Sequence, residues 1–501
     1  MKITNGSNRN YGLAVAVLAM GLLLAPASAA TWTGNGADDF WSTAGNWDTA
    51  PSNPTGDAIL FDDQDAANPN TFDSALAANW QIGSLSFEKV GGDQQATVFN
   101  LDLGGYTLSS DGALEVGDLP GNFSPRENGT ISTNITNGTL VIGSAGQRAN
   151  LIVAQNYTRR FTATLTMGPG SSIDMRHLNS FYVAQGNVHE PGLKGRLDLR
   201  DATIVGGGIS ANTLWIGEGG RTTETDPQSG IIYVDDSSGL SSIDVAGTWL
   251  MGRGPSRVVE SYFGDPDNDW KLPANVDINV GVDAANRGEL LIASDPGAAR
   301  SDITAKLAAS SGGTFTGYLT TLEVAIGSYD GRYGQTTDVQ GTLDLAAMNS
   351  ITLDVAGPIQ AGLQARVDDV ATGRILLPDG TVTATSTELG AENTAGEGYL
   401  ELNGTEMTTG SLTLHESAEI IINSFADGGG IYVTSSAAGD LAIADGGIIT
   451  INFAGDPDSW DNLNGLRVEG DRVSELQALE TAGKLVLNTA NLSPAVQQHM
   501  H

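Results

Sequence analysis

The chain has 501 residues, of which 65 are glycine and none is cysteine, and 59 acidic residues against 24 basic ones give a net charge of −35. A negative field of this size repels nucleic acids and anionic membranes, so we expect no nucleic-acid partner. Because no disulfide can form, stability must come from backbone hydrogen bonds and apolar packing.

Residues 1–30 have the features of a secretory signal peptide. Lys2 and Arg9 supply positive charge, residues 13–24 form an apolar core, and Ala27-Ser-Ala29 is a small-residue cleavage site. The apolar run is shorter than the ~20 residues of a membrane-spanning helix. The sequence therefore predicts a secreted or cell-surface protein whose mature chain begins near Ala30 and has no membrane span.

Residues 31–110 form a distinct opening segment that is rich in tryptophan. It holds four of the eight tryptophans, Trp32, Trp41, Trp47 and Trp80. Bulky aromatic side chains suit the cap of a stacked fold, because the first repeat has no neighbour above it. The alternative interpretation is an exposed platform on which Trp41 and Trp47 contact carbohydrate.

Residues 111–455 repeat a short sequence phrase. An apolar stretch ends in glycine or alanine, a polar turn follows, and then comes Gly-x-h-x-h, where h is an apolar residue. Most intervals between the glycines are 53 to 58 residues and one is 35; the glycines are Gly138, Gly195, Gly230, Gly288, Gly341 and Gly398. Such repetition with period-2 alternation is typical of a solenoid. We therefore predict an all-β fold, a parallel β-helix with rungs of roughly 20–25 residues. A string of β-sandwich domains is the alternative.

Residues 456–501 form a closing segment with one short helix. Residues 472–483 carry a helical pattern in which Ser474 is the expected N-cap, Gln477 has the capping-box spacing and Gly483 ends the helix. Residues 484–487 then read as a final strand. This helix is expected to close the end of the solenoid.

A repeated aspartate turn is the strongest candidate for a metal site. Asp265, Asp267 and Asp269 alternate before a tryptophan, and Asp456 and Asp458 recur in a similar phrase. Alternate aspartates can direct oxygen ligands at calcium, the one cofactor considered. An ordinary type I turn explains the same residues.

The sequence offers no catalytic constellation. Two adjacent acid pairs, Asp235-Asp236 and Asp368-Asp369, stand among 59 acids, and neighbouring strand residues point to opposite faces. Glycoside cleavage needs two carboxyl groups about 5–10 Å apart from separate segments. We therefore name no catalytic residue and leave an enzymatic role open.

The two ends of the chain resemble those of a group of bacterial secreted repeat proteins. The opening Trp32…Trp41…Asn46-Trp47…Asp57…Phe61 and the closing 465–484 segment are similar to the autotransporter-associated β-strand and PEP-CTERM-type surface proteins of planctomycete-like bacteria. The resemblance implies an exported surface protein and no particular chemistry. The chain ends without the sorting signal of that group, which indicates either a truncated chain or a released protein.

We therefore expect a non-enzymatic, exported β-solenoid with a structural or adhesive role at the cell surface or in the extracellular matrix. Its expected partners are extracellular polysaccharides or components of the cell envelope. The alternatives are a carbohydrate-active solenoid enzyme, such as a polysaccharide lyase or hydrolase, and a carbohydrate-binding protein.

Overall fold

The computed structural model describes most of the chain between residues 29 and 493. The described ranges are 29–53, 56–63, 71–89, 96–118, 129–155, 161–186, 193–218, 228–254, 258–295, 302–327, 338–364, 370–391, 396–424, 429–437, 439–453, 465–470 and 472–493. The predicted signal peptide lies almost wholly outside these residues. Among the residues described, no helix combines the length and apolar character needed to cross a bilayer.

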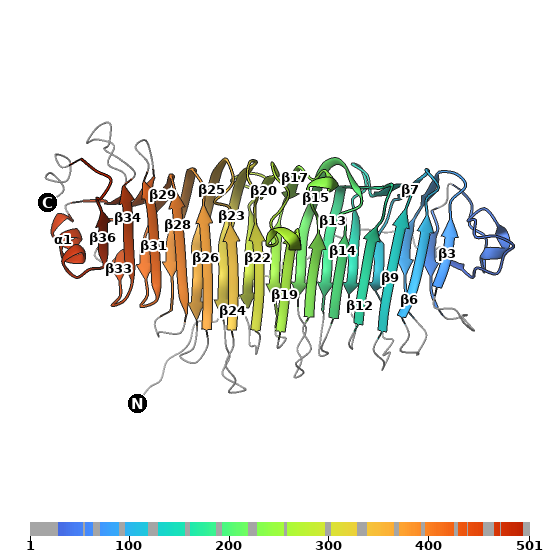
Figure 1. Ribbon diagram of the computed structural model, residues 1–501, viewed down its shortest axis with the longest axis horizontal. Helices are drawn as coiled ribbons and strands as arrows, with labels where there is room; N and C mark the ends of the chain where they lie inside the picture. The colour runs from blue at the N-terminus through green and yellow to red at the C-terminus, as the bar shows by residue number, and fades with distance from the viewer. Residues whose placement is uncertain are drawn as a thin grey trace, which may run out of the picture.

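The described residues form a long rod of parallel strands, the predicted parallel β-helix (Figure 1). One side is a 14-stranded sheet whose strands follow one another in chain order, so that each strand marks one coil. These strands are β3 (Thr71–Ala75), β6 (Ala96–Asp102), β9 (Gly129–Thr136), β12 (Phe161–Met167), β14 (Leu193–Asp198), β16 (Gln228–Tyr233), β19 (Val258–Gly264), β22 (Asp302–Ala308), β24 (Asp338–Asp344), β26 (Val370–Leu377), β28 (Glu397–Asn403), β31 (Ala418–Ser424), β34 (Ile448–Phe453) and β36 (Leu485–Asn488).

A 22-stranded sheet makes up the other two sides. Its strands are β1 (Ala30–Trp32), β2 (Ala58–Phe61), β4 (Trp80–Ile82), β5 (Ser84–Phe87), β7 (Thr107–Ser110), β8 (Leu114–Asp118), β10 (Gly138–Ile142), β11 (Ala149–Gln155), β13 (Ser171–Gln185), β15 (Thr203–Glu218), β17 (Ser242–Val245), β18 (Thr248–Arg253), β20 (Asp277–Val280), β21 (Gly288–Asp295), β23 (Thr314–Gly327), β25 (Ser350–Gln364), β27 (Gly380–Leu389), β29 (Thr405–Thr409), β30 (Leu412–Leu414), β32 (Gly430–Val433), β33 (Leu441–Ile443) and β35 (Leu466–Val468). Long strands such as β13 pair with β10 along their first half and with β11 along their second half, so they join the two sides.

The core is a single stack of apolar side chains that runs along the rod. In the 14-stranded sheet, the same inward position is occupied in ten successive coils by Leu165, Leu197, Ile232, Phe263, Leu307, Leu343, Ile375, Leu400, Ile420 and Ile449. All ten are buried, and burying each such side chain stabilises the fold by about 1.5–3 kcal/mol. This stack explains the period-2 alternation of the sequence.

At four of its six glycines, Gly195, Gly230, Gly341 and Gly398, the repeated phrase marks the same corner of the coil. Where the apolar stretch ends, the backbone adopts a left-handed conformation with φ between 52° and 76° at Ala154, Ala184, Gly217, Gly252, Ala293, Ala325, Gly362 and Gly390. Across the corner lies a column of small residues in the 14-stranded sheet, Ala163, Gly195, Gly230, Ser261, Ala305, Gly341, Gly373, Gly398 and Ala418. A Cβ on Gly230 would lie 2.3 Å from the Gly217 amide nitrogen, so the two backbones meet too closely for any side chain.

The interval between phrases is not the length of one coil. Gly195 pairs with Gly230, so the single 35-residue interval is one turn, whereas Gly341 and Gly398 are two turns apart, with Gly373 between them. Gly138 and Gly288 begin strands of the other sheet. The number of residues in a coil varies: one short coil runs from Leu400 to Ile420, and one long coil runs from Phe263 to Leu307. The prediction of 20–25 residues per rung is therefore wrong for most coils.

Both ends of the rod are closed as predicted, although the helix begins differently. Helix α1 (Val473–Thr481) packs beside β36 at the C-terminal end (Figure 1). Its N-cap is Arg472, which has no side-chain capping bond and instead pairs with Glu475, so the predicted N-cap at Ser474 is wrong. Gly483 has φ 71° just after the helix, as a stop residue should. The described residues also form three short 3₁₀ turns, η1 (Ala44–Asn46), η2 (Asp236–Ser238) and η3 (Pro266–Asn268).

An ion pair links coils of the 22-stranded sheet and predicts a pH dependence. Arg287 donates 2.7 Å hydrogen bonds to the backbone oxygen and the carboxylate of Asp354. This guanidinium lowers the pKa of the Asp354 carboxyl below 3.8. Because the folded-state pKa is depressed, the stabilisation is present above pH 3.8 and is lost as the pH falls through the lowered value.

Asp354→Asn should therefore lower the free energy of unfolding at pH 7 by about 0.5 kcal/mol, as for a solvent-screened ion pair. The difference from the wild-type chain should shrink as the pH falls below 3.8 and vanish once the carboxyl is protonated in both folded and unfolded states. Denaturant unfolding of both proteins at pH 7 and at several pH values below 3.8 measures this difference in the free energy of unfolding. A difference in the free energy of unfolding that did not change with pH would show that the ion pair is not its cause.

Candidate functional site

The tryptophans of the opening segment form the cap and not a sugar-binding platform. Trp41 is 1% exposed and Trp47 is 6% exposed, and their rings meet edge to face at 89° with centroids 5.5 Å apart. The Trp47 indole nitrogen donates to the Trp41 carbonyl oxygen at 2.8 Å. Neither ring offers a face to a ligand, so the predicted carbohydrate contact at Trp41 and Trp47 is wrong. The rings are buried because the first coil needs apolar cover.

The first aspartate turn does not gather its carboxylates around one point. Asp265 is the N-cap of η3, and its side chain accepts from the Asp267 amide. Asp269 pairs with Lys306 at 2.5 Å, and this hydrogen bond lowers the pKa of the Asp269 carboxyl. No three His, Cys, Asp or Glu side chains in the described ranges are arranged to hold a metal ion. The structure therefore does not bring the carboxylates of Asp265, Asp267 and Asp269 together, and calcium at this turn stays a prediction.

The second aspartate turn lies outside the described residues. Asp456 and Asp458 both fall in the gap between residues 453 and 465. Calcium binding at these two positions stays a prediction. Of the adjacent acid pairs, Asp368-Asp369 also lies outside the described ranges, while Asp235 caps η2 and Asp236 accepts from the Ala274 amide. Asp235 therefore stabilises its own turn, and Asp236 bonds that turn to the segment before β20.

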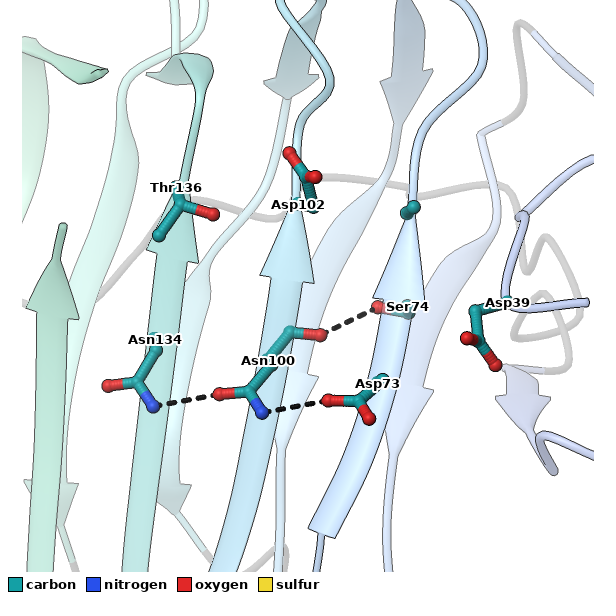
Figure 2. A pocket seen from close by; sticks show the side chains of 8 residues that line it. Asp39, Asp73, Ser74, Asn100, Asp102, Asn134 and Thr136 are labelled. Atoms are coloured by element: carbon teal, nitrogen blue, oxygen red, sulfur yellow. Dashed lines mark hydrogen bonds between the residues drawn. The ribbon is translucent and has the colours of Figure 1, made fainter. Parts of the chain in front are cut away.

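A polar pocket of about 350 Å³ lies where the cap meets the 14-stranded sheet (Figure 2). Its floor is a hydrogen-bonded row across three coils, in which Asn134 donates to Asn100 and Asn100 donates to Asp73, each at 2.8 Å. Figure 2 shows Asp39 facing this row from the cap. The full lining is Asp39, Asp73, Ser74, Ala75, Asn100, Asp102, Asn134 and Thr136.

The pocket offers carboxylate, amide and hydroxyl oxygens and no basic side chain. Such groups can form hydrogen bonds with the hydroxyls of a sugar. Asp102 is already engaged, since it accepts from the Gly104 amide at 2.8 Å and from the Asn137 side chain at 3.2 Å. Asp39 and Asp73 come from segments that are far apart in sequence and lie across the pocket from each other (Figure 2).

An aromatic cluster on the outer surface of the same sheet lies in the middle of the rod. Tyr262 of β19 stacks on Trp270, with ring centroids 4.6 Å apart and an 18° angle between planes. Tyr233 of β16 lies 5.7 Å from the Trp270 ring, and the Arg200 guanidinium lies 4.8 Å above the Tyr233 ring. Burial raises the pKa of the Tyr262 hydroxyl, with a smaller contribution from the Glu260 charge. Tyr262 therefore stays neutral and can donate a hydrogen bond.

The turn after β19 places Trp270 over the sheet by an unusual backbone conformation. Asp269 and Trp270 have φ values of 54° and 60°, in the left-handed region that bulky residues rarely adopt. Backbone amides of Asn268 and Trp270 both donate to the Asp265 carbonyl, which closes the turn. We therefore assign the Asp-Pro-Asp phrase the role of presenting Trp270 on the outer face.

Sequence reasoning missed this aromatic cluster. Tyr233, Tyr262 and Trp270 come from three segments, and their proximity depends on the register between β16 and β19. One signal was available: the phrase with Asp265 ends in a tryptophan, and so does its echo at Asp456. The recurrence ties the tryptophan to the turn, but it does not give its burial, since Trp47 directly follows the turn η1 and is buried.

Comparison with known proteins finds no matching family model, no similar sequence among curated proteins and no similar solved structure. The function must therefore be argued from the fold and from these surface features.

Proposed function

We propose that this protein is an exported β-solenoid with a structural, adhesive role at the cell surface or in the extracellular matrix. The observation that carries the proposal is the unbroken core, one apolar stack that extends through the coils and is closed by the tryptophan cap and by α1. A capped solenoid holds its surface groups at fixed spacing along a stiff axis, which suits a spacer or scaffold.

Two sequence features support the location. Residues 1–30 have the composition of a secretory signal, and the chain of net charge −35 contains no cysteine. A strongly acidic surface favours solubility and association with cations outside the cell. The resemblance of both ends to autotransporter-associated and PEP-CTERM-type surface proteins points the same way, and membership of that group is part of the proposal.

Outer polar ladders support a role that requires stiffness. Near the C-terminal end, Asn423 donates to Asn403, Asn452 to Asn423 and Asn488 to Asn452, at 2.7, 2.9 and 3.2 Å. Each bond joins one coil to the next on the solvent side, in addition to the backbone ladder. Adjacent coils are therefore joined by side-chain hydrogen bonds on the solvent side as well as by the backbone ladder.

A carbohydrate-active enzyme is the second candidate, and one observation favours it. Asp39, Asp73 and Asp102 reach the same pocket from three separate segments, as the paired carboxyl groups of glycoside cleavage do. Asp73→Asn would abolish such an activity. The structural proposal expects this substitution to have no effect on any polysaccharide.

Location can be tested with the full chain produced in a bacterial host. We expect the protein in the surface or medium fraction, with a mature N-terminus at Ala30 or Thr31 by mass spectrometry. External protease should reach it on intact cells. An intact N-terminus in the cytosol would contradict the proposal, and deletion of residues 2–29 should produce that distribution as the control.

A further inference from the structure

The outer face of the 14-stranded sheet between β14 and β22 combines aromatic rings with basic side chains. The row Arg196, Ile231, Tyr262 and Lys306 crosses four neighbouring strands in register. This row spans three strand spacings, or ~14 Å. Lys194 lies beside Arg196 on the same face of β14, two positions earlier. We call these residues, with Arg200, Tyr233 and Trp270, the central patch.

The basic residues of the central patch lie among acidic ones, and Glu260 shares the outer face of β19 with Tyr262. The patch holds four basic residues, Lys194, Arg196, Arg200 and Lys306, from a chain with 24 basic and 59 acidic residues. Arg200 pairs with Asp198 at 2.6 Å and Lys306 pairs with Asp269 at 2.5 Å. Lys194 and Arg196 form no ion pair with any described residue, and Arg196 is exposed. The patch therefore keeps two cations available to an anionic ligand.

The aromatic rings supply the second half of the recognition chemistry. Tyr262, Trp270 and Tyr233 are each partly exposed on the outer face. The apolar face of a sugar ring packs against such side chains, whose hydroxyl and indole groups also bond to sugar hydroxyls. The Arg196 guanidinium can hold a carboxylate with two parallel hydrogen bonds. Arg196 and Lys306 lie at the two ends of the row with Tyr262 between them, and this spread along the rod axis fits an extended polymer.

We propose that the central patch binds an acidic polysaccharide, with a sugar ring against the stacked pair of Trp270 and Tyr262 and sugar carboxylates at Arg196 and Lys194. This inference rests on the proposed function, because it names the ligand of the adhesive rod. The overall negative charge opposes a polyanion at long range. Salt near 0.15 M confines that repulsion to about 8 Å and leaves the contacts in the patch effective.

The test is the affinity of the purified full chain for immobilised polygalacturonate and for dextran, a neutral glucan, at 0.15 M salt. Trp270→Ala should weaken binding to polygalacturonate roughly tenfold, and Arg196→Gln roughly fivefold. Salt at 1 M should weaken the wild-type interaction at least as much. Because Arg196 is exposed and unpaired, its variant should fold normally even if Trp270→Ala disturbs its turn.

Matched controls come from another aromatic–cation pair. Arg467 lies 4.5 Å above the Tyr432 ring in the 22-stranded sheet, and Tyr432→Ala and Arg467→Gln should leave polygalacturonate affinity unchanged. Equal binding by wild type, Trp270→Ala and Arg196→Gln would overturn the assigned site but not the adhesive function. If dextran bound as tightly as polygalacturonate, or if neither polymer bound, the proposal that the ligand is an acidic polysaccharide would be overturned. A cytosolic chain would instead contradict the proposed function, whatever the purified protein binds.

Discussion

Gly230→Val should lower the free energy of unfolding by about 3 kcal/mol or more. A Cβ at this position would lie 2.3 Å from the Gly217 nitrogen and 2.6 Å from the Val183 oxygen. Both are backbone atoms of the opposite strands, and neither can move without disturbing the ladder. Because solenoid coils unfold in neighbouring groups, hydrogen exchange in β14, β16 and β19 should accelerate most.

Gly146→Ala provides the control for this prediction. A Cβ on Gly146 meets no atom within 4 Å, and the residue lies in an exposed turn. The substitution should change the stability by less than about 0.5 kcal/mol. If Gly230→Val were as stable as Gly146→Ala, the close approach of the two backbones at this corner would be disproved.

Trp41→Ala should cost about 3–5 kcal/mol and should loosen the N-terminal coils first. The Trp41 ring packs against Trp47, Trp80 and Phe61, with centroids 5.4 to 5.9 Å apart. Removing it leaves a cavity at the end of the stack and opens the first coil to water. Limited proteolysis and hydrogen exchange should show early opening of β1, β2 and β5 while β28 and β31 stay protected.

The neighbouring residue Phe40 is the matched control, because its side chain is 42% exposed. Phe40→Ala should leave both the thermal midpoint and the order of opening close to those of the wild-type chain. Uniform opening of all coils in Trp41→Ala would contradict the role of the cap. So would a stability equal to that of Phe40→Ala.

The solenoid was predictable because its cause is local and repeated. Period-2 alternation reflects the inward positions that every coil must fill with apolar side chains. The recurring glycine reflects a corner where two backbones approach closely. The coil length was not predictable, since connections between strands vary and the phrase occurs at corners of both sheets. Gly138 and Gly195 look alike in sequence, but Gly138 begins β10 of one sheet and Gly195 lies within β14 of the other.

Surface features were harder to predict from sequence than the core. Tryptophan can be cover for a core or a contact for a ligand, and only burial separates Trp41 from Trp270. The row from Arg196 to Lys306 depends on register across four strands whose separations in sequence differ. The pocket likewise needs Asp39 of the cap to lie opposite Asp73, which no sequence spacing encodes.

The most direct test of an adhesive, structural role measures retention and polymer length in one experiment. The purified chain is incubated with polygalacturonate and with dextran, with and without calcium, and each polymer is then sized by chromatography. An adhesive, structural role predicts that polygalacturonate is retained by the protein and that its length distribution does not change. Shortening of either polymer, abolished by Asp73→Asn, would contradict this role and assign the pocket a catalytic one.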